Sequence, residues 1–186
     1  MTPPFHTRWA TAADLPTLRA LMARAIDTLQ TGFLSREQVA ASRAIMGLDT
    51  QLVADGTYLV VELAGRIVGC GGWSRRATLY GGDHSAALRD PALLDPLRDA
   101  AKVRAMYTHP DFARQGIGRL VLTTCENAAA AEGFASVELM ATLSGQPLYA
   151  ACGYESVETT EAIVEGIGVP LVRMRKDLPA AGIVRP

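Results

Sequence analysis

The chain has 186 residues, 49% of them hydrophobic and 20% charged, and carries a formal net charge of −1 at pH 7. These values favour one compact folded domain over a disordered chain, and the lack of a basic excess argues against a general nucleic-acid binder. No apolar run approaches the roughly 20 residues of a membrane-spanning helix, and the N-terminal residues lack the apolar segment of a signal peptide. We therefore expect a cytoplasmic protein with no membrane contact, in which residues 1–178 form a single domain and residues 179–186 a loose tail.

The three cysteines, Cys70, Cys125 and Cys152, are widely spaced and odd in number, without a Cys-x-x-Cys pair or a nearby pair of histidines. This pattern is typical of reduced thiols rather than of disulfides or zinc ligands. We expect no metal site.

The first third of the chain predicts a strand and two helices. Residues 7–10 suit a short strand, and apolar residues then recur at helical spacing from Leu15 to Leu29. Asp14 is the expected N-cap of that helix. A capping-box pattern at residues 35–38 opens a second helix, which Gly47 can end.

A β-hairpin is predicted next. Residues 58–63 and 66–73 are rich in β-branched and aromatic side chains and flank a turn that contains Gly65. The second strand also contains three glycines, which indicate a bulge or the close approach of another segment: Gly69, Gly71 and Gly72.

Residues 75–98 show no convincing periodicity and contain two glycines and two prolines. A connection of this length is usually either a functional loop or disordered. We keep both interpretations, a mobile flap over a binding site and a disordered segment.

Residues 101–131 predict a strand, a sharp turn and a helix whose apolar residues recur at helical spacing from Ile117 onward. Two glycines in the turn allow the backbone to approach a ligand closely, and the start of the helix offers unpaired N–H groups. Two arginines add positive charge beside them. The turn contains Arg114, Gly116, Gly118 and Arg119. It predicts a phosphate or pyrophosphate site, with an ordinary strand-to-helix turn as the alternative.

Two other nucleotide-binding motifs are excluded by spacing. A P-loop needs four residues between its glycines and then Lys with Ser or Thr, and a dinucleotide fingerprint needs a third glycine where Val121 stands.

The last third predicts a strand over residues 135–141, a short helix over residues 146–152, and a closing hairpin of residues 154–159 and 170–175. Four glutamates make that hairpin acidic, which a solvated face explains: Glu155, Glu158, Glu161 and Glu165.

Two motifs resemble a known family. The segment HPDFARQGIGRLVL, residues 109–122, resembles the acetyl-CoA motif of the GNAT superfamily of N-acetyltransferases, written Gln/Arg-x-x-Gly-x-Gly/Ala. The segment QPLYAACGYES, residues 146–156, resembles the second signature of the same family. One departure is that Ala113 stands where the motif has Gln or Arg, so the basic side chain moves to Arg114.

The resemblance implies an α/β fold with a mixed, mostly antiparallel central sheet, flanked by helices and with splayed central strands. It also implies an acetyl-CoA-dependent acyltransferase that needs no metal and moves an acetyl group to a primary amine of a small molecule or peptide by direct attack. A homodimer is left open.

The same resemblance implies the roles of individual residues. The turn would hold the coenzyme pyrophosphate, and a break in the central strand would expose backbone groups to the pantetheine arm. Tyr149 would be the general acid, because a phenol stays protonated at neutral pH and can donate to the departing thiolate. The coenzyme-binding residues would be Met106, Tyr107, Thr108, Arg114, Gln115, Gly116, Ile117, Gly118, Arg119 and Thr142.

The sequence leaves the general base and the acceptor open. Candidate bases are Glu138, His109, Asp83, His84 and a water chain. The hairpin glutamates suggest a cationic acceptor, whereas three arginines suggest an acidic one: Arg75, Arg76 and Arg104. The alternatives to an enzyme are a non-catalytic acyl-CoA-binding or regulatory module and a phosphate-binding module for another nucleotide.

Overall fold

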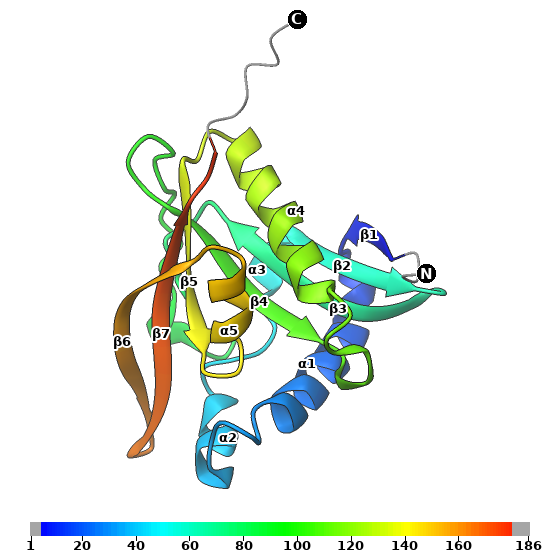
Figure 1. Cartoon of the computed structure of the whole chain (residues 1–186), viewed down its shortest axis with the longest axis vertical. Coiled ribbons are helices and arrows are strands. Elements are labelled where there is room, and N and C mark those ends of the chain that lie inside the picture. The colour runs from blue at the N-terminus through cyan, green and yellow to red at the C-terminus, as the bar shows by residue number, and fades with distance from the viewer. Residues whose placement is uncertain (1–4, 180–186) are drawn as a thin grey trace, which may run out of the picture.

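The computed structural model describes residues 5–179, so the predicted tail lies outside the described residues except for Pro179. A seven-stranded sheet runs through the molecule in the order β1-β2-β3-β4-β5-β7-β6, antiparallel except for the β4–β5 pair (Figure 1). The strands are β1 His6–Trp9, β2 Tyr58–Leu63, β3 Arg66–Ser74, β4 Ala101–Thr108, β5 Ser136–Thr142, β6 Glu155–Val164 and β7 Ile167–Asp177. This architecture confirms the expected fold class.

Five α-helices and three short 3₁₀ turns are present in residues 5–179. The helices are α1 Leu15–Leu29, α2 Arg36–Ser42, α3 Thr50–Ala54, α4 Ile117–Ala131 and α5 Gln146–Ala151. The 3₁₀ turns are Ala12–Asp14, Ala86–Leu88 and Pro110–Phe112. Within these residues no helix is both long and apolar enough to cross a membrane.

The two long helices cover opposite faces of the sheet. Side chains alternate along a strand, so Tyr58 and Val60 of β2 pack with α1, whereas Leu59 and Val61 pack with α4. A third apolar cluster holds the end of α2 against β7. The sheet is therefore buried on both faces at its centre, where β3 and β4 lie.

The glycines of β3 bring α4 close to the sheet. A Cβ atom on Gly69 would lie 2.2 Å from Cγ2 of Ile117, and one on Gly71 would lie 2.7 Å from Cγ1 of Val121. The pairing of β3 with β4 also shifts register between Cys70 and Gly72. The close approach predicted from these glycines is confirmed, whereas the extra residue of this register shift lies on β4, where Ala105 and Met106 face Gly71.

The central strands separate after two paired positions. β4 and β5 pair only at Ala101 with Val137 and at Lys102 with Glu138. Beyond that point β4 has a positive φ of 51° at Ala105. The gap between the two strands widens toward the N-terminus of α4, and the candidate site lies there.

Several sequence predictions need correction. Asp14 makes no side-chain cap on α1; its carboxylate accepts hydrogen bonds from the backbone N–H of Thr11 and from the guanidinium of Arg8. The capping box of α2 is confirmed, but α2 ends at Ser42 rather than at Gly47, and the short helix α3 follows. The closing hairpin is longer than predicted, because β6 and β7 pair as far as Val164 and Ile167.

Of the two interpretations kept for residues 75–98, the disordered segment is wrong, and the mobile flap stays a prediction. Arg104 donates to the carbonyl oxygen of Gly81 at 2.7 Å, and Ser85 donates to that of Ala44 at 2.8 Å. The backbone N–H of Thr78 also donates to the carbonyl of Asp90 at 2.9 Å. These bonds fold the segment onto β4 and the α2–α3 connection, so that residues 79–81 form part of the wall of the site.

Candidate active site

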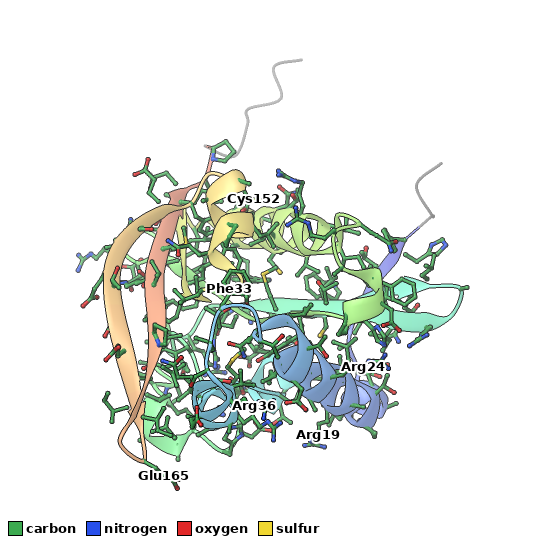
Figure 2. All side chains as sticks on the ribbon, turned by 60° about the horizontal axis from the view of Figure 1, so that its bottom comes forward. Arg19, Arg24, Phe33, Arg36, Cys152 and Glu165 are labelled. Atoms are coloured by element: carbon green, nitrogen blue, oxygen red, sulfur yellow. The ribbon has the colours of Figure 1, made fainter. Side chains whose placement is uncertain are left out.

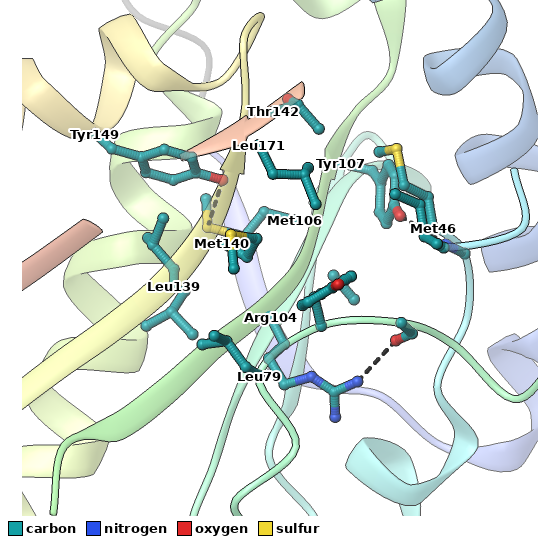
Figure 3. Close-up of a pocket in the computed structure, with 16 residues that line it drawn as sticks. Met46, Leu79, Arg104, Met106, Tyr107, Leu139, Met140, Thr142, Tyr149 and Leu171 are labelled. Atoms are coloured by element: carbon teal, nitrogen blue, oxygen red, sulfur yellow. Dashed lines mark hydrogen bonds between the residues drawn. The ribbon is translucent and has the colours of Figure 1, made fainter. Parts of the chain in front are cut away.

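Two adjoining cavities occupy the gap between β4 and β5. The larger, of about 620 Å³, extends from α1 to the N-terminus of α4 and to α5. The smaller, of about 80 Å³, lies between β4, β5, β7 and residues 79–81 (Figure 3). Five residues line both cavities: Met46, Met106, Tyr107, Thr142 and Tyr149.

The larger cavity is bounded at one end by the start of α4. Gly116 is the N-cap at a positive φ of 86°, and no side chain caps the helix. Leu120 is the first residue of the helix whose N–H donates to a backbone carbonyl, that of Gly116. The preceding N–H groups and the helix dipole therefore offer a site for an anion.

Ten of the eleven predicted site residues line this larger cavity; Gln115 is exposed and does not. The side chain of Ile117 is buried in the core, and the hydroxyl of Tyr107 accepts a 2.8 Å hydrogen bond from the N–H of Gly47. These two residues therefore offer a ligand mainly their backbone. Thr142 is also engaged, since its hydroxyl accepts from the N–H of Gly145 at 3.2 Å and lies 3.1 Å from that of Ser144.

Tyr149 lies where the two cavities meet. Figure 3 shows its ring extending from α5 toward β4, with the hydroxyl directed at Met106. The hydroxyl is 3.9 Å from the sulfur of Met106, and the ring packs edge-on against Tyr154. Burial raises the pKa of Tyr149 to about 12, so the phenol keeps its proton at neutral pH.

None of the carboxylates or imidazoles considered as a base lines either cavity. Glu138 is buried between Lys102 and Arg173. Burial raises its pKa, but the hydrogen bonds from those two cations outweigh burial and leave the pKa below its usual value. Among residues 5–179, in fact, no Asp, Glu or His lines the two cavities.

The other candidate bases have structural partners. Nε2 of His109 lies 2.8 Å from the guanidinium of Arg66, and burial together with that charge lowers the pKa of His109. Asp83 accepts from the N–H and the hydroxyl of Thr50, and His84 lies against a backbone carbonyl of the α2–α3 connection.

The arginines that suggested an acidic acceptor are each paired with a carboxylate of the protein. Arg75 pairs with Glu132, and Arg76 pairs with Asp55. Arg104 lines the smaller cavity, but it forms a buried ion pair with Asp49 at 2.6 Å.

The hairpin glutamates also lie outside the cavities. All four are exposed, and Glu165 is at the tip of the β6–β7 hairpin, far from α5 (Figure 2). Of the residues that carried the two conflicting signals for the acceptor, only Arg104 lines a cavity, and its charge is paired with Asp49.

Sequence reasoning missed the residues that complete the site from distant segments. Met46 on the α2–α3 connection and Phe33 on the α1–α2 connection line the larger cavity, and Figure 2 shows Phe33 on the side facing α5. Leu79 and Tyr80 line the smaller one. No local motif marks these positions, because each lies in an irregular connection.

Comparisons with known proteins agree with this architecture. A family model described as an acetyltransferase (GNAT) domain matches residues 54–156. No curated protein sequence matches the chain.

Solved structures match the fold over nearly the whole chain. A GCN5-related N-acetyltransferase from Rhodopseudomonas palustris is 20% identical, with a TM-score of 0.68 over 96% of this chain and 97% of its own. The PaiA N-acetyltransferase from Thermoplasma acidophilum, in complex with coenzyme A, is 14% identical, with a TM-score of 0.64 over 94% and 99%. The ribosomal-protein-S18-alanine N-acetyltransferase from Escherichia coli is 16% identical, with a TM-score of 0.58 over 98% and 99%. The matched family model covers more than half of the chain, which therefore belongs to the GNAT acetyltransferase family and is an acyltransferase.

Proposed function

We propose that the protein transfers the acetyl group of acetyl-CoA to a primary amine by direct attack, with Tyr149 as the general acid. The observation that carries this proposal is the position of the Tyr149 hydroxyl. It lies at the junction of a cavity large enough for the coenzyme arm and the smaller cavity that adjoins it in the gap between β4 and β5.

The larger cavity suits acetyl-CoA. The uncapped start of α4 binds the pyrophosphate through backbone N–H groups, with Arg114 and Arg119 adding positive charge. The pantetheine arm lies along Met106–Thr108, where β4 has separated from β5 and its backbone is free to pair with the arm. The structural neighbour from Thermoplasma acidophilum, solved with coenzyme A, supports this assignment.

The reaction then needs few groups from the protein. The amine nitrogen attacks the thioester carbonyl carbon, and a backbone N–H at the break in β4 stabilises the developing oxyanion. The C–S bond breaks, the leaving thiolate takes the proton of Tyr149, and the resulting phenolate recovers a proton from water. The attacking nitrogen loses one proton to water, because no side chain of the described lining is a base at neutral pH. The products are the acetamide and free coenzyme A.

Calorimetry with acetyl-CoA, followed by an assay of amine-dependent coenzyme A release, tests this function. We expect binding and release. Binding without release on any amine would support the non-catalytic acyl-CoA-binding module instead. No binding at millimolar acetyl-CoA, or ATP or NAD displacing it, would contradict both.

A further inference from the structure

The lining of the smaller cavity restricts the acceptor, if the proposed acetyl transfer is correct. Its walls are mainly apolar and come from five separate segments of the chain: Ile45, Met46, Leu79, Met106, Leu139, Met140 and Leu171. Three of these are methionines, whose flexible side chains adapt to an apolar group. The volume of about 80 Å³ suits a compact group rather than a long chain.

The charges around the cavity disfavour a cation. The titratable side chains in its lining are those of Arg104, Tyr80, Tyr107 and Tyr149, and none of them is an anion at neutral pH. Asp49 pairs with Arg104 but is fully buried behind it. An ammonium group entering the cavity would lose its water without gaining a carboxylate, which is strongly unfavourable.

The same surroundings disfavour an acceptor that carries a carboxylate. The charge of Arg104 is already paired with Asp49, and its guanidinium also donates to the carbonyl oxygen of Gly81. The bond to Gly81 holds residues 79–81 in place as a wall. Among the described residues the buried Nε–H of Arg104 has no partner, so it can donate to a neutral acceptor atom such as an amide oxygen.

We infer that the acceptor is a weakly basic amine, bound in its neutral form, attached to a compact apolar group and carrying no second charge. An α-amino group has a pKa of about 7.7–8.0, whereas an alkyl amine such as that of lysine has one of about 10.4. At pH 7 the neutral fraction therefore differs by roughly two to three orders of magnitude. A site without a base therefore selects strongly for an amine whose pKa is as low as that of an α-amino group.

Four probe amines test the inference through initial rates of coenzyme A release. Leucinamide is apolar and weakly basic, 3-methylbutylamine has the same apolar group on a strongly basic nitrogen, spermidine is a polycation, and glutamic acid α-amide carries a carboxylate. We expect kcat/KM at pH 7 to be at least about tenfold higher for leucinamide than for each of the others. From pH 7 to pH 9, kcat/KM for 3-methylbutylamine should rise about tenfold per unit, following its neutral fraction.

A second experiment tests the inference by placing a charge in the smaller cavity. Met46 lines both cavities on an irregular connection, so Met46→Glu adds a carboxylate and Met46→Gln is the matched uncharged control. We expect Met46→Glu, relative to Met46→Gln, to lower the preference for leucinamide over 3-methylbutylamine by about tenfold or more. An unchanged preference in Met46→Glu would contradict the inference.

The outcomes separate this inference from the proposed function. Preference of the unaltered protein for spermidine or glutamic acid α-amide, or a pH-independent rate with 3-methylbutylamine, would overturn the inference while leaving acetyl transfer intact. Binding of acetyl-CoA with no release on any of the four amines or a broader amine panel would contradict the proposed function itself.

Discussion

The hydroxyl of Tyr58 donates a hydrogen bond of 2.7 Å to the carbonyl oxygen of Ala105, the residue at which β4 takes its positive φ. An alanine in the left-handed region is strained, so it persists only where its surroundings hold it. Tyr58 is fully buried under α1 and comes from β2, two strands away from β4. It therefore fixes the break in β4 from behind, next to Met106 and the junction of the cavities.

Substitution Tyr58→Phe removes this bond and leaves the carbonyl oxygen of the partly buried Ala105 without its partner. We expect the free energy of unfolding to fall by about 1–3 kcal/mol, measured by urea denaturation. The matched substitution Tyr80→Phe, on a half-buried connection, should change it by less than about 0.5 kcal/mol. Equal effects of the two substitutions would show that the Tyr58 bond does not hold the bulge.

Substitution Gly69→Ala tests whether the close approach of β3 to α4 positions the coenzyme site. The added methyl group would meet Cγ2 of Ile117, a stiff β-branched side chain at the first position of α4. We expect a loss of about 1–3 kcal/mol in stability and weaker acetyl-CoA binding by calorimetry. Gly32→Ala is the control, because its Cβ would meet no other atom within 4 Å. Unchanged coenzyme affinity in Gly69→Ala would contradict this role for the glycine.

A comparison of two glycines with nearly the same backbone conformation distinguishes the effect of backbone strain from that of ligand contact. Gly116 has φ 86° at the start of α4, and Gly166 has φ 82° in the β6–β7 turn; a Cβ on either would meet no protein atom within 4 Å. Valine at each position should lower the free energy of unfolding by a similar amount, on the order of 1–2 kcal/mol or more. Only Gly116→Val should also weaken acetyl-CoA binding, because its side chain would occupy the larger cavity. Equal affinities in the two variants would place the pyrophosphate elsewhere.

Glu138 is predicted to serve stability rather than proton transfer. Substitution Glu138→Gln leaves Lys102 buried without a counter-charge and should cost about 3 kcal/mol or more. Because the folded pKa of Glu138 lies below its usual value, its contribution is present at neutral pH and is lost as the pH falls below about 4.5. The stability of the unaltered protein should therefore fall with acid more steeply than that of Glu138→Gln.

The kinetic control for Glu138 is the pH profile. Above pH 6, Glu138→Gln should keep the shape of the kcat/KM profile, since water takes the proton from the attacking amine. A large loss of kcat/KM in Glu138→Gln above pH 6, under conditions where the variant is folded, would identify Glu138 as the general base.

Local signals in the sequence were sufficient for the regular parts of the fold. The helical spacing of α1 and α4 and the capping box at Ser35 each depend on residues close together in the chain, and the structure confirms all three. Helix α3 has only five residues, too few to show periodicity. β6 is largely exposed and polar, so its length is set by pairing with β7 rather than by its own pattern.

Side-chain contacts that no helix or strand pattern encodes explain the remaining differences. The carboxylate of Asp14 is held by Arg8, six residues earlier in the chain, so that it does not cap α1. Residues 75–98 gain their order from partners such as Arg104, which are remote in sequence.

The candidate site likewise contains residues that local motifs mark and residues that only long-range folding brings together. The turn before α4 and Tyr149 belong to local motifs and could be found from the sequence. The lining of the smaller cavity combines several segments that only the folded chain brings together: residues 45–47, 79–81, 103–107, 139, 140, 142, 149 and 171. The absence of a charged base in the described lining was therefore beyond sequence reasoning, even though it constrains the acceptor most.

The measurement that tests the central claim most directly is kcat of Tyr149→Phe on an accepted amine, under conditions where chemistry limits the rate. The phenyl ring keeps the packing against Tyr154, so stability and acetyl-CoA affinity should change little. Loss of the proton donor should lower kcat by about 10²- to 10⁴-fold. Full kcat in Tyr149→Phe would show that Tyr149 only packs at the junction of the cavities, and would contradict the proposed mechanism.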